Sequence, residues 1–252
     1  MIFVIKLSNV SIRVKTVYDT FYVNFHHYIY DSKPYKKTSI NICITSTILD
    51  QEERRLNRFN YNDNVDVVDY QRSKQEIEAN AVYREICDEM PRFNTFLMHG
   101  SVIAKDGYAY MFTAPSGIGK TTRTRLWLDL YPDAIVVNGD KPLIKITSSE
   151  AIACGTPWCG KEGWNTNTMV PLRAIFLLER AEEGEKSSIE EISLGKAFPF
   201  LLQQTYRPED PDLMRKTLAL LKSLEGKVKI YKFRSTPTEE SVRLAYETAR
   251  PR

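Results

Sequence analysis

Cysteines, histidines and long apolar runs are scarce in this chain, and each shortage excludes a class of protein. The four cysteines have neither metal-ligand spacing nor the spacing of a disulfide framework, so we expect reduced thiols in a cytoplasmic protein. No apolar run approaches the roughly 18 residues that a membrane-spanning helix needs. The N-terminus also becomes polar too early for a secretory signal, so we expect no membrane association.

A large excess of one charge is missing as well. The 35 Lys and Arg residues against 32 Asp and Glu residues leave a net charge of +3, which is too small to indicate binding to nucleic acid. We therefore expect no nucleic-acid partner. The length of 252 residues permits one large domain or two modest ones, and the composition is that of an ordinary globular protein.

Two of the three histidines are adjacent, His26 and His27, in a segment that we predict as a strand over residues 21–30. Neighbouring residues of a strand point to opposite faces, so these two side chains cannot form a common ligand pair. We interpret both as structural.

We expect residues 1–95 to form a β-rich region with one helix, packed on a core formed by residues 96–252. Runs of β-branched and aromatic residues predict strands at residues 2–7, 11–17, 21–30 and 40–45. The polar stretch 51–69 predicts a loop or an edge hairpin. An apolar stripe at helical spacing predicts a helix over residues 73–90.

The most specific chemistry lies in residues 114–121, which read Ala-Pro-Ser-Gly-Ile-Gly-Lys-Thr. The apolar run before them, residues 108–113, predicts a buried strand, and the pattern after them predicts a helix over residues 122–131. A strand, a glycine-containing turn, Lys-Thr and a helix form the context that a phosphate-binding loop requires. Ala114 replaces the first glycine of the strict motif.

Each residue type of this motif has a physical reason. Backbone N–H groups of the turn and the positive end of the helix dipole converge on phosphate oxygens. Gly117 and Gly119 allow positive φ and a close approach of the backbone. Lys120 would reach the β and γ phosphates, and the Thr121 hydroxyl would bind Mg²⁺. We therefore predict phosphate binding, with ATP and Mg²⁺ as ligands.

A candidate carboxylate follows a strand predicted at residues 134–137, in the sequence Asn138-Gly139-Asp140. An acidic residue at the end of the strand after a phosphate-binding loop is the expected position of a Mg²⁺-binding or catalytic carboxylate. The same tripeptide is also a common turn sequence, so both interpretations stay open. The glycine-rich residues 155–163 predict an active-site loop, in which Trp158 and Lys161 are candidates for lining an acceptor pocket.

The remaining patterns predict a mixed α/β fold. The apolar run at residues 96–103 leads through Asp106-Gly107, a strong hairpin signal, into the strand before the loop. Thr236, Pro237 and Glu239 predict the N-cap, first residue and capping box of a last helix. Further strands are predicted at residues 143–146, 151–154, 174–179, 188–193 and 228–233, and further helices at residues 195–206 and 212–224.

Several blocks of the second half, taken together, are similar to one known family. They are His99-Gly100-Ser101, the loop at 114–121, Thr124-Arg-Leu-Trp127, Asp140-Lys-Pro142, Gly155-Thr-Pro-Trp158 and Gln203-Gln-Thr-Tyr-Arg-Pro208. The chain resembles the catalytic core of HPr kinase/phosphorylase, which shares its P-loop fold with phosphoenolpyruvate carboxykinase. It resembles most closely the compact bacterial HPr-kinase-related proteins, which are often encoded near peptide-modifying systems. The likeness covers residues 96–252, whereas residues 1–95 resemble only the compact relatives.

The resemblance implies a P-loop core with a mixed sheet and a role for each matched residue. Lys120 would hold the transferred phosphate, Thr121 and Asp140 would bind Mg²⁺, and Asp140 would otherwise accept the proton of the attacking hydroxyl. His99 would lie beside the metal and the γ-phosphate. The expected catalytic residues are thus Asp140, His99 and Lys120, and the expected nucleotide-binding residues are Pro115, Ser116, Gly117, Ile118, Gly119, Lys120, Thr121, Thr122 and Arg207. Arg207 is equally compatible with a surface salt bridge.

The chain departs from the family at one position of the site. The family has two consecutive aspartates at this strand end, whereas this chain has Gly139 followed by Asp140 and so a single carboxylate. The Arg-Gly segment that HPr kinase uses for its own substrate is not recognisable here. We therefore do not transfer HPr to this chain as the acceptor.

From these patterns we expect a Mg-ATP-dependent kinase that transfers the γ-phosphoryl group to a hydroxyl, on Ser or Thr of a protein or peptide. Two alternatives stay open. One is an ATP-binding accessory or scaffold protein of a peptide-modification system with little or no transfer activity, which Gly139 favours. The other is a small-molecule kinase. The expected partners are a nucleotide and a protein or peptide acceptor, and self-association into a homo-oligomer is left open.

Overall fold

The computed structural model describes residues 1–18, 25–31, 38–62, 72–115, 117–182 and 185–251. These residues divide into two compact units, Met1–Glu89 and Met90–Arg252, whereas we predict the boundary between residues 95 and 96. Each unit combines helices with a mixed sheet, so the predicted mixed α/β class is confirmed at that level. Within the described ranges no helix is both long and apolar enough to cross a bilayer.

The first unit contains a sheet in the strand order β3-β1-β2-β4. Its elements are β1 (Ile2–Leu7), β2 (Val10–Lys15), η1 (His26–Tyr28), β3 (Ile29–Asp31), β4 (Ile40–Cys43), α2 (Ser46–Asn62) and α3 (Lys74–Glu89). β1 and β2 form an antiparallel hairpin, and β4 lies parallel to β2. The buried carboxylate of Glu78 in α3 accepts hydrogen bonds from the backbone N–H groups of Val17 (2.6 Å) and Tyr18 (2.9 Å), which joins α3 to the chain beyond β2.

Two predictions for this unit are wrong. Residues 46–62 form a helix where we predict a loop or hairpin from residue 51, because Glu, Arg, Leu and Gln favour a helix and the Thr45 hydroxyl accepts a hydrogen bond from the N–H of Ile48 (3.4 Å). The rest of that stretch, residues 63–71, lies outside the described residues. His26 and His27 belong to η1 rather than to a strand, and their ring centroids are 3.5 Å apart. Their side chains therefore do not point to opposite faces.

The second unit is built on a curled sheet in which the long strand β11 (Met169–Arg180) joins two parts. In the order β8-β6-β7-β11-β13-β12, the central strands β7 and β13 both lie parallel to β11. In the order β5-β9-β10-β11, neighbours are antiparallel, and β10 pairs with the beginning of β11. The other strands are β5 (Thr95–Leu97), β6 (Ser101–Lys105), β7 (Tyr108–Thr113), β8 (Ile135–Asn138), β9 (Leu143–Ile146), β10 (Ala151–Cys154), β12 (Ser188–Glu191) and β13 (Lys229–Ser235).

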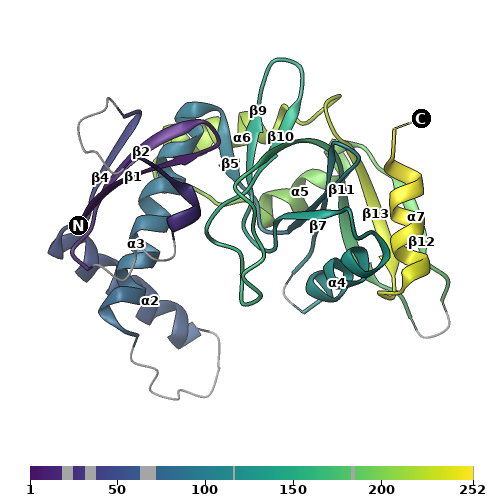
Figure 1. Ribbon diagram of the computed structural model, residues 1–252, viewed down its shortest axis with the longest axis horizontal. Helices are drawn as coiled ribbons and strands as arrows, with labels where there is room; N and C mark the ends of the chain where they lie inside the picture. The colour runs from purple at the N-terminus through teal and green to yellow at the C-terminus, as the bar shows by residue number, and fades with distance from the viewer. Residues whose placement is uncertain (19–24, 32–37, 63–71, 116, 183–184, 252) are drawn as a thin grey trace. The chain divides into compact units, whose positions relative to one another are not determined.

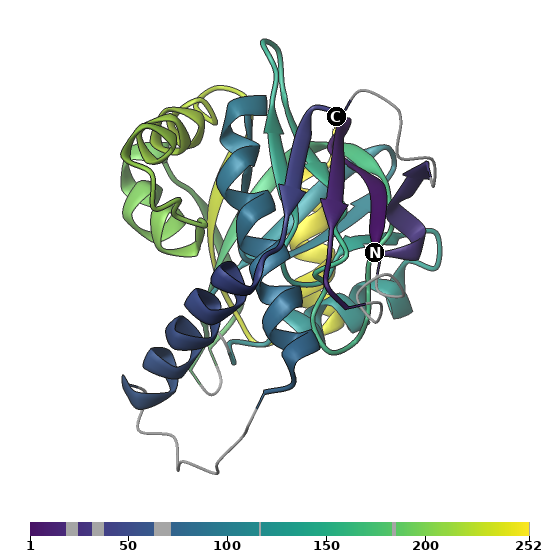
Figure 2. The same ribbon diagram turned by 90° about the vertical axis from the view of Figure 1, so that its left-hand side faces the viewer.

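Helices cover both faces of the central strands (Figure 1). They are α4 (Lys120–Leu130), α5 (Leu194–Gln204), α6 (Pro211–Lys222) and α7 (Glu239–Ala249), whereas the short helix η2 (Met90–Phe93) contacts α6 and β5. Along β7, Tyr110 and Phe112 pack with α4 and α7, whereas Ala109 and Met111 pack with α5 and α6. Figure 2 shows α5 and α6, in green, side by side and apart from α7, in yellow. Because both faces of these strands are apolar, both need a helical cover.

The apolar run at residues 96–103 forms two strands rather than one. β5 pairs with β9, whereas β6 pairs with β7 and β8, because the chain leaves the first pairing after Leu97 and enters the second at Ser101. The hairpin predicted at Asp106-Gly107 is confirmed: both residues have positive φ (52° and 79°) between antiparallel β6 and β7.

The last helix has a different cap from the predicted one. Its N-cap is Thr238 rather than Thr236, and the capping box is completed by Ser241 rather than Glu239. The Thr238 hydroxyl accepts a hydrogen bond from the N–H of Ser241 (3.2 Å), and the Ser241 hydroxyl accepts one from the N–H of Thr238 (3.1 Å). Two short hydroxyl side chains therefore satisfy the first turn without a glutamate.

Candidate functional site

Three chain segments with candidate chemistry meet at one edge of the sheet. β6 runs antiparallel to both β7 and β8, so the start of β6 lies beside the ends of β7 and β8. His99 and Gly100 precede β6, the loop at 114–121 follows β7, and Asp140 follows β8. The backbone N–H of Gly100 donates to the carbonyl of Asp140 (2.8 Å), and the Thr113 hydroxyl donates to the carbonyl of His99 (2.7 Å). His99 and Asp140, which are far apart in the sequence, thus share one edge of the sheet.

The loop after β7 leads into an open helix N-terminus. Gly117 and Gly119 have φ of 83° and 97°, the left-handed region that other residues rarely adopt. Gly119 is the N-cap of α4, and no described side chain caps this helix. The first-turn N–H groups, which belong to Lys120 and the two threonines after it, are therefore open to an anion at this edge. Ser116 lies outside the described residues.

The Lys120 ammonium is folded back on its own loop. Its Nζ donates to the carbonyls of Ala114 (2.9 Å) and Pro115 (3.2 Å). Burial lowers the pKa of Lys120, and the charge of Asp140 partly opposes that shift. Among the described residues no carboxylate forms an ion pair with this ammonium. To contact a phosphate, the ammonium would therefore give up only its hydrogen bonds to two neutral carbonyl oxygens.

Asp140 is held by the turn that precedes it. The side-chain oxygen of buried Asn138 accepts hydrogen bonds from the N–H groups of Asp140 (2.9 Å) and Lys141 (2.7 Å). The Asn138 amide nitrogen donates to the carbonyl (3.0 Å) and hydroxyl (2.9 Å) oxygens of Thr156. The Asn-Gly-Asp sequence is thus a turn that also presents its aspartate at the edge, so the two interpretations of the sequence are compatible.

His99 bridges Asp140 to helix α5. Its Nε2 lies 3.1 Å from the Asp140 carboxylate, and its Nδ1 lies 3.0 Å from the side-chain oxygen of Gln204. Because both neighbours are oxygens, the ring donates to both only when each nitrogen carries a proton. Burial would raise the pKa of Asp140, but the hydrogen bond and charge of His99, with the charges of Lys141 and Lys120, outweigh it and hold that pKa below its ordinary value.

The turn has no room for a second carboxylate at Gly139. A Cβ added there would lie 2.9 Å from the backbone carbonyl oxygen of Cys159 and 3.4 Å from the Trp164 Cβ. The Gly139 N–H donates to the Trp164 carbonyl (2.9 Å), so the 155–165 loop lies directly on this residue. The glycine at this position therefore coincides with a close backbone approach. Burial raises the pKa of the Cys159 thiol, and the nearby charge of Asp140 adds to the effect.

The other residues predicted for the site differ in how far they are exposed. Pro115, Gly117 and Thr122 are exposed, whereas Ile118, Gly119 and Thr121 are half-buried. Arg207 is exposed between Tyr206 and Pro208, and no hydrogen bond or ion pair joins it to the described loop residues, so its predicted role in nucleotide binding stays a prediction. Trp158 and Lys161 lie in the 155–165 loop, the first half-buried and the second exposed.

Sequence reasoning missed two side chains of this edge. Gln204 lies in the segment 203–208 that carries the family resemblance, but the sequence assigned it no role. Its contact with His99 depends on an irregular pairing between residues 97–99 and 204–206. Arg180 ends β11, and its guanidinium approaches the Gly117 carbonyl at 3.5 Å. The parallel pairing of β11 with β7, which brings Arg180 to this edge, has no local signal in the sequence.

The donor set fits magnesium better than a protein-only metal centre. Within the described part of the chain, no three His, Cys, Asp or Glu side chains gather closely enough to hold a metal ion. Mg²⁺ commonly takes one or two protein oxygens and fills its other positions with phosphate oxygens and water. The Thr121 hydroxyl and the Asp140 carboxylate are oxygen donors of that kind.

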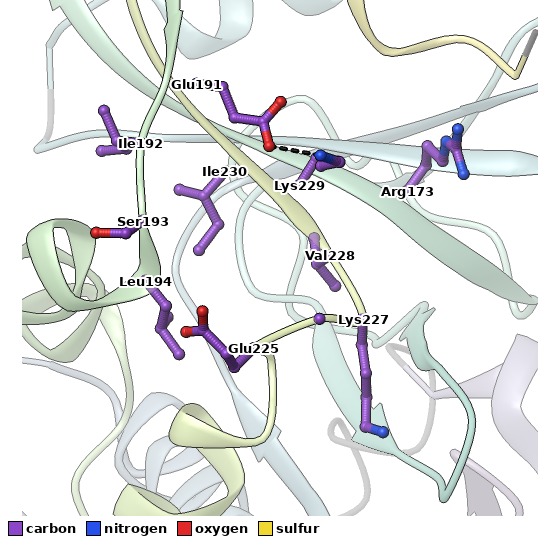
Figure 3. Close-up of a pocket in the computed structure, with 11 residues that line it drawn as sticks. Arg173, Glu191, Ile192, Ser193, Leu194, Glu225, Lys227, Val228, Lys229 and Ile230 are labelled. Carbon is purple, nitrogen blue, oxygen red and sulfur yellow. Dashed lines mark hydrogen bonds and ion pairs between the residues drawn. The ribbon is translucent and has the colours of Figure 1, made fainter.

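A separate pocket of about 400 Å³ lies around the beginning of β13, at the opposite edge of the sheet from the loop (Figure 3). Its three cations have partners: Lys229 pairs with Glu191 (2.5 Å), Arg173 donates to the Ala249 carbonyl (3.3 Å), and Lys227 donates to the Ser148 carbonyl (2.7 Å). Since the cations are engaged and the pocket is remote from Lys120, we do not include it in the candidate site.

Comparisons with known proteins leave the family open. Neither the models of protein families nor the curated proteins gave a match to this sequence.

Proposed function

We propose that this protein is a Mg-ATP-dependent kinase of the HPr-kinase-like type, with a P-loop core, that phosphorylates a hydroxyl on Ser or Thr of a protein or peptide. The observation that carries the proposal is the meeting of Lys120 and the His99–Asp140 pair at one sheet edge, beside an uncapped helix N-terminus. We also propose a cytoplasmic location, on the cysteine spacing described above.

The loop and Lys120 provide the positive potential that a triphosphate needs. Phosphoryl transfer depends on positioning and on stabilising negative charge more than on covalent chemistry by the protein. The Lys120 ammonium turns from the Ala114 and Pro115 carbonyls to the phosphates, while the N–H groups of the loop and of the first turn of α4 donate to phosphate oxygens. Mg²⁺, when bound through Thr121 and Asp140, would offset further phosphate charge.

Asp140 is the group that takes the acceptor proton. The acceptor oxygen forms a bond to the γ-phosphorus, the bond between that phosphorus and the ADP oxygen breaks, and the hydroxyl proton passes to the carboxylate. A low pKa keeps Asp140 ionised at neutral pH, as both this role and metal binding require. It also makes Asp140 a weak base, which is sufficient for a transition state with little bond formation to the acceptor.

The first prediction tests this assignment. ADP release in the presence of acceptor peptide should fall on the order of 10²–10³-fold in Lys120→Ala, because a charge aimed at the transferred phosphate is lost. It should fall on the order of 10²–10⁴-fold in Asp140→Asn, because the base is lost. Matched controls are Lys222→Ala and Asp129→Asn, which change exposed residues of α6 and α4 and should keep full activity. Full activity in both Lys120→Ala and Asp140→Asn would disprove the assignment.

One observation favours a second function, that of an ATP-binding accessory protein without efficient transfer. The crowding at Gly139 leaves a single carboxylate for both metal binding and proton transfer. Incubation with [γ-³²P]ATP and cell lysate separates the possibilities: a labelled protein or peptide supports the kinase, a labelled metabolite supports a small-molecule kinase, and ATP binding without label transfer supports the accessory role.

A further inference from the structure

Gln204 contacts His99 through both its backbone and its side chain. The Gln204 carbonyl accepts a hydrogen bond from the N–H of His99 (2.7 Å), and its side-chain oxygen lies 3.0 Å from His99 Nδ1. Met98 and Thr205 form an antiparallel bridge, and the N–H of Tyr206 donates to the Leu97 carbonyl (2.9 Å). This short pairing places residue 204 opposite residue 99, so the contact between the two side chains is set by the backbone.

The contact determines which edge of the imidazole faces Asp140. An imidazole ring turns about its χ2 angle with broad freedom unless a partner holds it. With Nδ1 held by Gln204, Nε2 points at the Asp140 carboxylate, 3.1 Å away. About 30% of each side chain in this pair is accessible, so the pair is open to a ligand and water would otherwise compete for the ring. Only Gln204 fixes the ring from the side away from Asp140 among the described residues.

We propose that Gln204 is a positioning residue that orients His99 toward Asp140. Its backbone keeps α5 in register with the start of β6, and its side chain holds the ring. The consequence for activity rests on the proposed kinase function, whereas the orientation itself does not. Residues that hold a histidine in this way from a second layer typically change metal affinity or activity by 10- to 100-fold when they are removed.

The neighbouring residue provides a matched control. Gln203 has the same side chain on the same helix, but it is exposed, and no hydrogen bond of it is found in the described structure. Gln203→Leu and Gln204→Leu therefore make the same chemical change at adjacent positions. Gln204→Glu keeps a side-chain oxygen at the same distance along the chain, and it should restore the contact with Nδ1.

The second prediction uses the ring itself as the readout. The chain has three histidines, so ring-¹⁵N-labelled protein gives a simple long-range ¹H–¹⁵N spectrum, in which the signal lost in His99→Gln identifies His99. The unaltered protein should show one defined pair of His99 Nδ1 and Nε2 signals, because the contact with Gln204 holds the ring in one orientation. Gln204→Leu should lose that signature, whereas Gln203→Leu and Gln204→Glu should keep it. An unchanged His99 spectrum in Gln204→Leu, folded as judged by circular dichroism, would overturn the proposal.

The kinetic arm separates this proposal from the kinase assignment. In an active protein, Gln204→Leu should lower kcat about 10- to 100-fold while the KM for ATP stays unchanged, because the loop and Lys120 hold the phosphates without Gln204. An unchanged kcat together with a changed ring spectrum would overturn the positioning role. If the unaltered protein transfers no phosphate, the kinase assignment fails, and the ring measurement still decides the orientation.

Discussion

Arg123 shows at the scale of one residue how the base of the loop is held. Arg123 as a whole is 2% exposed. Its guanidinium donates to the hydroxyls of Ser241 (2.9 Å) and Ser235 (2.7 Å) and lies 4.6 Å from the Phe233 ring centroid. Burial lowers the pKa of Arg123 to about 10, so the guanidinium stays charged at neutral pH. Two serines and an aromatic ring thus hold a buried cation three residues after Lys120, and they tie α4 to β13 and α7.

The third prediction follows from this packing. Arg123→Ala should lower the free energy of unfolding by about 2–4 kcal/mol, because it leaves a cavity beside Phe233 and removes two buried hydrogen bonds. Urea denaturation with a comparison of m-values measures the change. Arg125→Ala, which alters an exposed residue of the same helix, should change stability by less than about 0.5 kcal/mol. Equal effects of the two substitutions on the free energy of unfolding would show that the burial of Arg123 does not contribute to stability.

At the scale of elements, the 155–165 loop and the turn after β8 determine each other's shape. Asn138 joins them through Thr156, and Gly139 allows the backbone of Cys159 to approach. The φ of Gly139 lies outside the left-handed region, so the reason for glycine here is space. At Gly117 and Gly119 the reason is instead the backbone conformation. Their φ is positive, and an added Cβ would meet no atom closer than 3.8 Å.

The fourth prediction contrasts two glycine substitutions. Gly139→Ala should lower the free energy of unfolding by about 1–3 kcal/mol, because the new Cβ forces the loop backbone away. Gly195→Ala should raise it by about 0.4–1 kcal/mol, because position 195 lies in α5, its nearest neighbour atom is 4.0 Å away and alanine has less freedom when unfolded. Thermal or urea unfolding measures both. If Gly139→Ala were as stable as the unaltered protein, the loop would not be packed as described.

At the scale of the whole molecule, the second unit is a sheet whose two edges differ in chemistry. One edge carries the loop, His99 and Asp140, and the other carries the pocket of about 400 Å³. The parallel central strands produce this polarity, because all of their carboxyl ends lie at the same edge.

The fifth prediction asks which edge binds nucleotide. Mg-ATP at about 100 times its Kd should stabilise the second unit by roughly 2.7 kcal/mol, which corresponds to a rise in Tm of about 5–10 °C. Lys120→Ala should abolish the rise, and Lys222→Ala should keep it. A full shift in Lys120→Ala would place the nucleotide elsewhere in the molecule, and the pocket beside Lys229 would then be the first region to examine.

The sequence by itself determined the local elements of this protein. The apolar run at Tyr108–Thr113, the turn at Asp106-Gly107 and the helical patterns depend on neighbours within a few residues, and the structure has strands, turn and helices at those places. The local patterns failed at α2, where a polar stretch is compatible with either a loop or a helix, and at the start of α7, where Thr236 and Thr238 are both suitable N-cap residues. Such choices differ by only about 1 kcal/mol.

Only the tertiary structure decided which distant residues meet. The contact of His99 with Asp140 and Gln204 requires antiparallel pairing of β6 with β7 and β8 and a bridge between residues 98 and 205. The crowding at Gly139 requires a loop from beyond β10. These pairings depend on burying apolar surface between segments far apart in the chain, and no local pattern of residues encodes that free energy.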